Sequence, residues 1–491
     1  MSKKKSHSLS KNALNTKHSP NIKKFKPLKF WLLNDRGRYI IDPAKLKKFL
    51  ELNNFRIIDY SGKWLVVKVE NNIAKVYNPQ EMFNYVLKYI EKQNDDKLSS
   101  SFIKDGENFL MSKKAILGSL PELNATRFKD TKNSAIVFFK NVFVVVDKKG
   151  CKCYNYSHLS NIIPNQYIFE RQIIKQEFKH RKDYKASQFR KFLTLSTNEK
   201  KHFKNVATAI GYILHRNKNP SLAKAVILSD ILSQATNSAN GRSGKGIIIK
   251  ALEQLLNVVE YNGKNLDLAR DRFVYQSIDI ETDLFVLQDV QQNFSFESLF
   301  AVLTDKMNIE KKHQDKITLN FESSPKIAVT TNYTLSDTGG SFSDRKHLVL
   351  LNNYFSATYK PEKHFGNLFF LEWNKKEYQR FYSFMIYCLT QYFKKGLVNY
   401  NSPELRFQKL ENETNKAFVQ IMESNYNELR TYYLLKNIAN ELGEEINSSE
   451  DSVRSRVVSN WIESWASFKG YKVDKRTSAG VVKVAFENIK S

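Results

Sequence analysis

Cysteine and long apolar runs are scarce in this chain of 491 residues. The three cysteines are Cys151, Cys153 and Cys388, and a single Cys-x-Cys without a second pair completes neither a four-ligand zinc site nor a disulfide framework. No stretch approaches the roughly 20 apolar residues that span a bilayer, and the N-terminus lacks the apolar centre of a secretory signal. We therefore expect reduced thiols and a protein that stays in the compartment where it is made.

Acidic residues are also few relative to basic ones. Lys and Arg number 78 against 50 Asp and Glu, which gives a formal charge of +28 and a pI near 9.6. A polyanionic partner follows, because each neutralised phosphate releases condensed counterions. A Lys-rich and Asn-rich composition throughout the chain would give the same excess, so the charge favours a nucleic-acid partner without establishing one.

The length predicts about three folded domains, and 41% hydrophobic and 13% aromatic residues suffice for their interiors. Residues 1–29 hold nine lysines and no acidic residue, which predicts a disordered basic tail. An α+β domain is expected over 30–180, a helical lead-in with an α/β core over 181–400, and a mostly helical unit over 401–491.

Apolar runs at 225–228, 284–287 and 327–330 alternate with helical segments, which predicts a parallel sheet covered on both faces. A strand pair is expected at 134–139 and 142–146 around a short Lys-Asn turn. Near the C-terminus, a helix around Trp461 precedes two strands and a Ser-Ala-Gly turn, a pattern that favours a winged-helix-like module.

The strongest motif is a glycine-rich turn that opens onto an apolar helix. Such a turn directs backbone N–H groups and the helix dipole at an anion, and Lys245 can reach the β- and γ-phosphates of a nucleotide. Ala239 and Gly246 depart from the general phosphate-loop pattern, since they replace a glycine and a metal-binding hydroxyl. An ordinary glycine-rich turn is the alternative. The predicted nucleotide-binding residues are Asn240, Gly241, Arg242, Ser243, Gly244, Lys245 and Gly246.

Two further apolar strands end in polar side chains. Asp289 follows one of them and can hold Mg²⁺ or polarise a water, while Asn332 follows the other and can orient a water or the γ-phosphate. Arg345 lies in a later loop and can serve as an arginine finger.

Between these strands, residues 307–319 alternate in a way that predicts a hairpin with a basic tip. The tip contains Lys311, Lys312 and His313. A solvated charged turn is an equal alternative.

The order of these motifs between residues 240 and 345 resembles the superfamily 3 helicases, in particular the phage, plasmid and poxvirus primase-helicase group. Segments 211–216, 323–326 and 365–373 resemble prophage primase-helicases as well. The resemblance implies a replicative DNA helicase in a bacterial host cytoplasm. It also implies an AAA+-like hexameric ring that hydrolyses ATP with Mg²⁺, moves along single-stranded DNA, and works beside a separate primase or other replication proteins, without a membrane.

Each motif has a counterpart in that family. The resemblance makes Lys245 the phosphate-binding lysine, Asp289 the acid of the second motif, Asn332 the sensor, Arg345 a finger that acts on the neighbouring subunit, and Lys311, Lys312 and His313 the pore hairpin. This chain departs from the family at Gln288, where a second acid is usual, and at Ser343 and Asp344, where relatives are more basic. These departures put the rate of hydrolysis in question.

Other functions are also compatible with parts of the pattern. Gln288 and Gly246 motivate a replication initiator or scaffold that binds ATP and DNA with little turnover. A terminase-like packaging motor would need clustered acids after the ATPase, and residues 403–491 offer none. Residues 30–180 lack the close carboxylate pair of a two-metal primase, so we expect an accessory or DNA-binding domain there, or a primase remnant.

Overall fold

The structure is a computed structural model. It describes residues 28–60, 63–112, 114–123, 130–159, 162–165, 168, 171–173, 183–231, 243–264, 268, 271, 273–291, 294–312, 316–333, 344–401, 407, 410–411, 414–446 and 455–488. The predicted basic tail up to residue 27 lies outside these ranges. No helix in the described ranges is long and apolar enough to cross a membrane.

The N-terminal unit combines helices with a four-stranded sheet of order β3-β4-β5-β9. Its core is formed by apolar faces of three helices, with Phe49, Val86 and Phe102 among the buried side chains. Its elements are β1 (Trp31–Leu33), β2 (Tyr39–Ile41), α2 (Pro43–Leu52), β3 (Phe55–Tyr60), β4 (Lys63–Glu70), β5 (Ile73–Val76), α3 (Pro79–Glu91), α4 (Asp96–Glu107), η1 (Asn108–Ser112), α5 (Lys114–Gly118) and β9 (Ile163–Pro164).

A separate three-stranded antiparallel sheet contains the predicted strand pair. It consists of β6 (Ser134–Phe139), β7 (Val142–Asp147) and β8 (Gly150–Tyr154), and the pairing of Phe139 with Val142 confirms the predicted short turn. One face of this sheet shares a hydrophobic core with the helices of the α/β unit. The sequence instead predicts that these strands belong to the domain expected over residues 30–180. Alternating strand residues such as Val137 and Val144 supply that face.

The central feature is a five-stranded sheet of order β11-β12-β15-β10-β16 in which every pair is parallel. This confirms the α/β class expected from the sequence. The strands are β10 (Ala225–Asp230), β11 (Val258–Asn262), β12 (Leu284–Val290), β15 (Lys326–Thr331) and β16 (Lys346–Leu351). All residues of β10 and β15 are buried, which explains their unbroken apolar runs.

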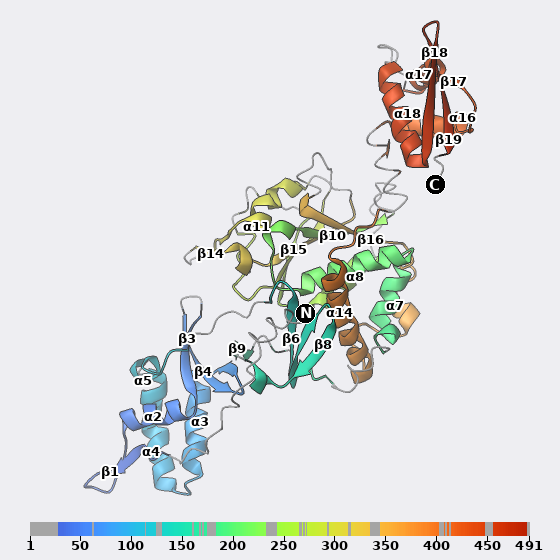
Figure 1. Cartoon of the computed structure of the whole chain (residues 1–491). Helices are drawn as coiled ribbons and strands as arrows, with labels where there is room; N and C mark the ends of the chain where they lie inside the picture. Colours follow the sequence, from blue (N-terminus) through green and yellow to red (C-terminus); the bar gives the residue numbers. More distant parts are fainter. Residues whose placement is uncertain are drawn as a thin grey trace, which may run out of the picture.

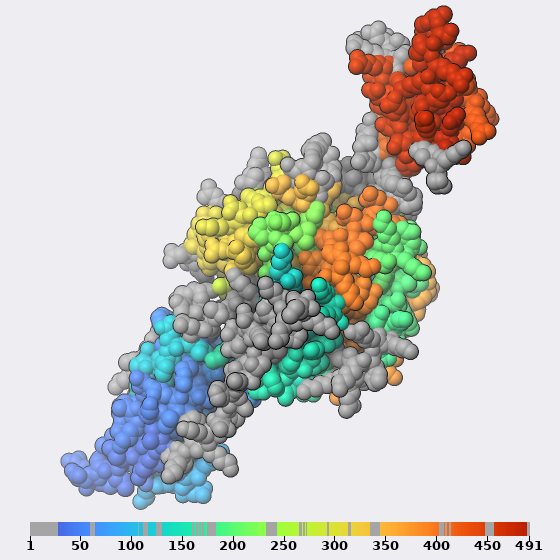
Figure 2. Space-filling model, in the orientation of Figure 1, coloured from blue at the N-terminus to red at the C-terminus, as the bar shows by residue number. Residues whose placement is uncertain are grey.

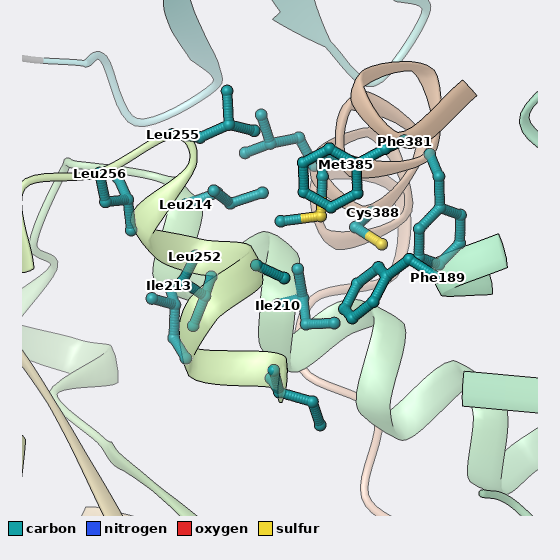
Figure 3. Packing of buried hydrophobic residues seen from close by; sticks show 14 of the residues in the cluster. Phe189, Ile210, Ile213, Leu214, Leu252, Leu255, Leu256, Phe381, Met385 and Cys388 are labelled. Atoms are coloured by element: carbon teal, nitrogen blue, oxygen red, sulfur yellow. The ribbon is translucent and has the colours of Figure 1, made fainter. Parts of the chain in front are cut away.

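Each face of this sheet has its own hydrophobic core. Val226 and Leu228 point into the first core, which Figure 3 shows between the helices α7 (Gln188–Leu195), α8 (Lys200–Leu214), α10 (Lys245–Glu253) and α14 (Lys375–Lys395). The alternating Ala225 and Ile227 point into the second core, with α11 (Phe300–Thr304), β13 (Met307–Ile309) and β14 (Ile317–Leu319) nearby.

The C-terminal unit has its own core and forms the lobe at one end of the molecule in Figures 1 and 2. Its elements are α16 (Lys416–Asn425), β17 (Tyr433–Leu434), α17 (Leu435–Glu445), α18 (Ser455–Lys469), β18 (Tyr471–Ser478) and β19 (Val481–Asn488). The strands form an antiparallel sheet of order β17-β19-β18. Ala479 and Gly480 form the predicted turn with φ of 48° and 77°, so the C-terminal hairpin is confirmed.

The described residues also include several short helical elements. They are η2 (Tyr156–His158), η4 (Asp183–Ala186), η5 (Pro220–Leu222), η6 (Phe296–Leu299), η7 (Phe321–Ser323) and α13 (Pro361–Phe365).

Candidate nucleotide site

The predicted phosphate-binding loop joins β10 to α10, and its last residues are described. Gly244 has φ of 103°, and a Cβ at this position would collide with the Phe192 ring, so only glycine fits. Lys245 begins α10, where unpaired backbone N–H groups favour an anion. Gly246 is exposed, and a Cβ there would meet nothing in the described part of the chain. The loop residues Asn240, Gly241 and Arg242 lie outside the described residues.

Lys245 is the centre of a buried polar cluster at the carboxyl edge of the parallel sheet. Its Nζ lies 2.6 Å from Asp230 Oδ2 and 2.7 Å from Asn332 Oδ1. The hydroxyl of Ser243 donates to the other carboxylate oxygen of Asp230. The structure therefore brings the predicted residues Ser243, Lys245 and Asn332 together. It adds Asp230, which the sequence reasoning missed although its position at the end of the buried strand before the loop was a usable signal.

Asp289 lies on β12, the neighbour of the strand that leads to Asn332. Its φ is 54°, in the left-handed region, and the register with β15 shifts between Leu287 and Val290. Its backbone N–H donates to Thr330 Oγ1 at 2.8 Å, while its side chain is exposed. Such a backbone costs a non-glycine residue on the order of 1–3 kcal/mol and is often found at functional sites. The bulge turns the Asp289 carboxylate out of the regular strand pattern.

Gln288 directly precedes Asp289 on β12, and its amide donates to the Glu260 carboxylate on β11. A hydrogen bond with Glu253, together with partial burial, raises the pKa of Glu260 to about 7. The sequence reasoning did not single out Glu260 or Glu253, because they meet only when α10 and β11 pack side by side. Gln288 is thus engaged with an acid on the neighbouring strand.

Arg345 lies away from this cluster within the same chain. It directly precedes β16, whose first residue pairs with Ala225, while Asp230 pairs with Leu351 at the other end. At about 3.3 Å per residue, β16 separates these ends by roughly 16 Å. The Arg345 guanidinium lies 4.6 Å from the centroid of the Phe300 ring. The structure therefore places Arg345 at the opposite edge of the sheet.

The predicted hairpin with a basic tip is present as β13 and β14. These strands are antiparallel, with Met307 opposite Leu319 and Ile309 opposite Ile317. Lys311 and Lys312 follow β13, and the Lys312 ammonium lies 5.6 Å from the centroid of the Phe273 ring. His313 lies outside the described residues. The structure confirms the hairpin, and the DNA contacts of its tip stay a prediction.

A metal at this site would receive few protein ligands. Among the described residues, no group of three or more His, Cys, Asp and Glu side chains could hold a metal ion. Mg²⁺ fits such a site, because it commonly takes one or two carboxylates together with substrate phosphates and waters. Asp289 supplies an exposed carboxylate of that kind.

No family model and no curated protein matches the chain. Among solved structures, the C-terminal region of NrS-1 covers 90% of this chain and 99% of its own, at 12% identity and a TM-score of 0.39. The JCV helicase covers 50% of this chain and 64% of its own, at 18% identity and a TM-score of 0.26. A full-length MCM homolog from Methanopyrus kandleri covers 70% and 75%, at 11% identity and a TM-score of 0.25. These likenesses are distant and assign no function to this chain.

Proposed function

We propose that this chain is an ATP-dependent DNA helicase of the superfamily 3, AAA+-like type. One observation carries the proposal: Lys245, at the start of α10, lies in hydrogen-bond contact with Asn332 at the carboxyl edge of the parallel sheet. Asp289 is the penultimate residue of β12, the next strand of the same sheet. A helix N-terminus, a lysine, an amide and an acid at one sheet edge are the groups that nucleotide hydrolysis needs.

Each group has a task that follows from its chemistry. The α10 N-terminus and the Lys245 ammonium neutralise the β- and γ-phosphates. Asn332 orients the attacking water, and Asp289 accepts a hydrogen bond from that water or holds Mg²⁺. Bound Mg²⁺ would supply charge neutralisation at the phosphates. Because Gly246 has no hydroxyl to bind Mg²⁺, we assign Asp289 as the protein ligand of the metal.

The DNA-binding and ring-forming parts of the proposal rest on the remaining features. A charge of +28 suits a phosphate backbone. The β13–β14 hairpin offers Lys311 and Lys312 to single-stranded DNA. Arg345 lies at the sheet edge opposite its own nucleotide site, and we assign it to the site of a neighbouring subunit in a hexamer. In the C-terminal unit, the order helix, strand, helix, helix, strand, strand fits a winged helix and supports a second contact with DNA.

The test replaces the lysine at the centre of the cluster. Lys245→Ala should abolish ATP hydrolysis, because no other described cation lies at the start of α10. Lys250→Ala is the matched control, since Lys250 lies on the same helix and is exposed. Phosphate release is measured with and without single-stranded DNA. A Lys245→Ala protein that hydrolyses ATP as fast as the Lys250→Ala protein would refute the nucleotide site.

A second candidate function is a replication initiator or scaffold that binds ATP and DNA with little turnover. The missing hydroxyl at Gly246 and the engagement of Gln288 with Glu260 favour it. The same assay separates the two functions. Stimulation of phosphate release by single-stranded DNA supports the helicase, whereas tight binding of ATP and DNA without turnover supports the scaffold.

A further inference from the structure

The buried carboxylate of Asp230 occupies an unusual place. Asp230 is the last residue of β10, and its side chain is 1% exposed. Both of its oxygens are engaged by residues of the nucleotide loop, one by the Lys245 ammonium at 2.6 Å and the other by the Ser243 hydroxyl. The cation that the proposed function assigns to phosphate is therefore already paired with an anion of the protein.

This pairing must change when phosphate arrives. An ammonium has three N–H donors, and Asp230 and Asn332 accept two of them. A carboxylate this close to the phosphates would also repel them, because buried charges interact strongly at short distance. Nucleotide can thus gain the full charge of Lys245 only if the contact with Asp230 weakens.

We infer that Asp230 is a positioning residue, an internal anion that holds Lys245 in the nucleotide-free site and gives it up to the phosphates. The inference rests on the proposed function. It predicts that the protein lowers its own affinity for nucleotide, and for the product ADP in particular. Release of ADP then restores the pair between Asp230 and Lys245, which favours departure of the product.

The test is the titration of fluorescently labelled ADP with Mg²⁺ into wild type and Asp230→Asn. The amide keeps the shape of the side chain and an acceptor for Ser243 but removes the charge. We expect Asp230→Asn to bind ADP about tenfold more tightly and to release it correspondingly more slowly, a change equivalent to about 1.4 kcal/mol. A residue that only supports the loop, or one that ligates Mg²⁺, would give unchanged or weaker binding, and either result would overturn the inference.

Two controls separate this effect from general damage. Asp283→Asn breaks another buried ion pair on the same sheet and should leave the ADP affinity unchanged. Lys245→Met combined with Asp230→Asn should bind ADP no better than Lys245→Met alone, because the gain acts through the ammonium. A gain that persists without Lys245 would count against the inference.

The outcomes also distinguish this inference from the proposed function. If wild type binds no ADP, both fail together. If wild type binds ADP and Asp230→Asn binds it no better, only the inference fails. If Asp230→Asn alone does not fold, the double variant Asp230→Asn with Lys245→Met is tested for folding by thermal unfolding. A folded double variant supports the charge pair between Asp230 and Lys245, and an unfolded one overturns the inference.

Discussion

The two edges of the central sheet each hold a buried ion pair, and the pairs differ in what surrounds them. At the amino edge, Arg216 Nε lies 3.0 Å from Asp283 Oδ1, and other guanidinium nitrogens donate to the backbone carbonyls of Ile136 and Leu255. At the carboxyl edge, the known partners of Lys245 are the side chains of Asp230 and Asn332. Backbone acceptors are fixed by the fold, whereas side-chain acceptors can turn away. A buried ion pair held by backbone acceptors is therefore suited to a structural role, whereas a pair held only by side chains can exchange its partners.

Burial shifts the pKa values of two titratable groups at the amino edge. It raises the pKa of Asp130 to about 6 and lowers the pKa of Lys326 to about 7. The Lys326 ammonium donates to the carbonyls of Tyr212 and His215 at the end of α8, and the Asp130 carboxylate accepts from the backbone of Arg216. These contacts tie α8 and the segment before β6 to the start of β15. The contacts at the amino edge thus hold together segments that are far apart in the sequence.

Breaking the amino-edge pair should have the largest effect on stability. Arg216→Met leaves Asp283 buried without its cation, so we expect the free energy of unfolding to fall by about 3–5 kcal/mol. Urea unfolding measures this loss. Lys45→Met is the control, because Lys45 pairs with Asp42 at the surface, where solvent screens the two charges and little stability depends on the pair. Equal losses in the two variants would contradict the structural role of the amino edge.

At the carboxyl edge we expect a loss of chemistry with the fold retained. Asp289→Asn removes the exposed carboxylate and should lower turnover on the order of 100-fold, comparable to the loss of one catalytic contact. Nucleotide affinity should change little, because α10 and Lys245 still bind the phosphates. Phosphate release and nucleotide titration test this separately. Normal hydrolysis by Asp289→Asn would show that the acid lies elsewhere.

The two glycines that flank Lys245 differ in the space available for a side chain. Gly244→Ala forces a Cβ into the Phe192 ring at a positive φ, and we expect a cost of about 1–3 kcal/mol together with weaker nucleotide binding. Gly246→Ala places its Cβ more than 4 Å from every neighbouring atom in the described part of the chain and should leave both quantities nearly unchanged. Thermal unfolding measures the stability of the two variants, and ADP titration measures their nucleotide affinity. Equal tolerance of both substitutions would mean that the loop does not hold this conformation.

The stability of the amino edge should also depend on pH, through the buried side chain of His215. Burial lowers the pKa of His215 to about 3, so the folded protein keeps this side chain neutral while the unfolded chain takes up a proton below about 6.5. Its contribution to stability is therefore present above pH 6.5 and is lost as pH falls toward 3, by about 1.4 kcal/mol per pH unit. His215→Asn cannot take up that proton. As pH falls from 6.5 toward 3, the unfolding free energy of wild type should therefore decrease relative to that of the variant, by about 1.4 kcal/mol per pH unit. A difference that does not change with pH would contradict the assignment.

Much of the candidate site could be predicted from the sequence. The apolar runs around Ile227, Val286 and Ala328 predicted buried parallel strands, and parallel strands bring their carboxyl ends to one edge. Ser243, Lys245 and Asn332 therefore meet as their positions in the chain indicate. The basic hairpin and the C-terminal hairpin were likewise predictable, because alternation and turn residues are local signals.

Only the tertiary structure decided which distant segments pack together. The Phe139 ring lies 4.9 Å from that of Tyr382, so the β6–β8 sheet belongs to the core around α14, a contact that no local pattern encodes. The left-handed backbone at Asp289 likewise depends on the register between β12 and β15. By itself the sequence determined which residues are apolar, charged or able to turn, because these properties belong to single residues and their neighbours. The pairing of Asp230 with Lys245 was decided by the packing of β10 against α10, since an ion pair exists only where the fold brings two charges together.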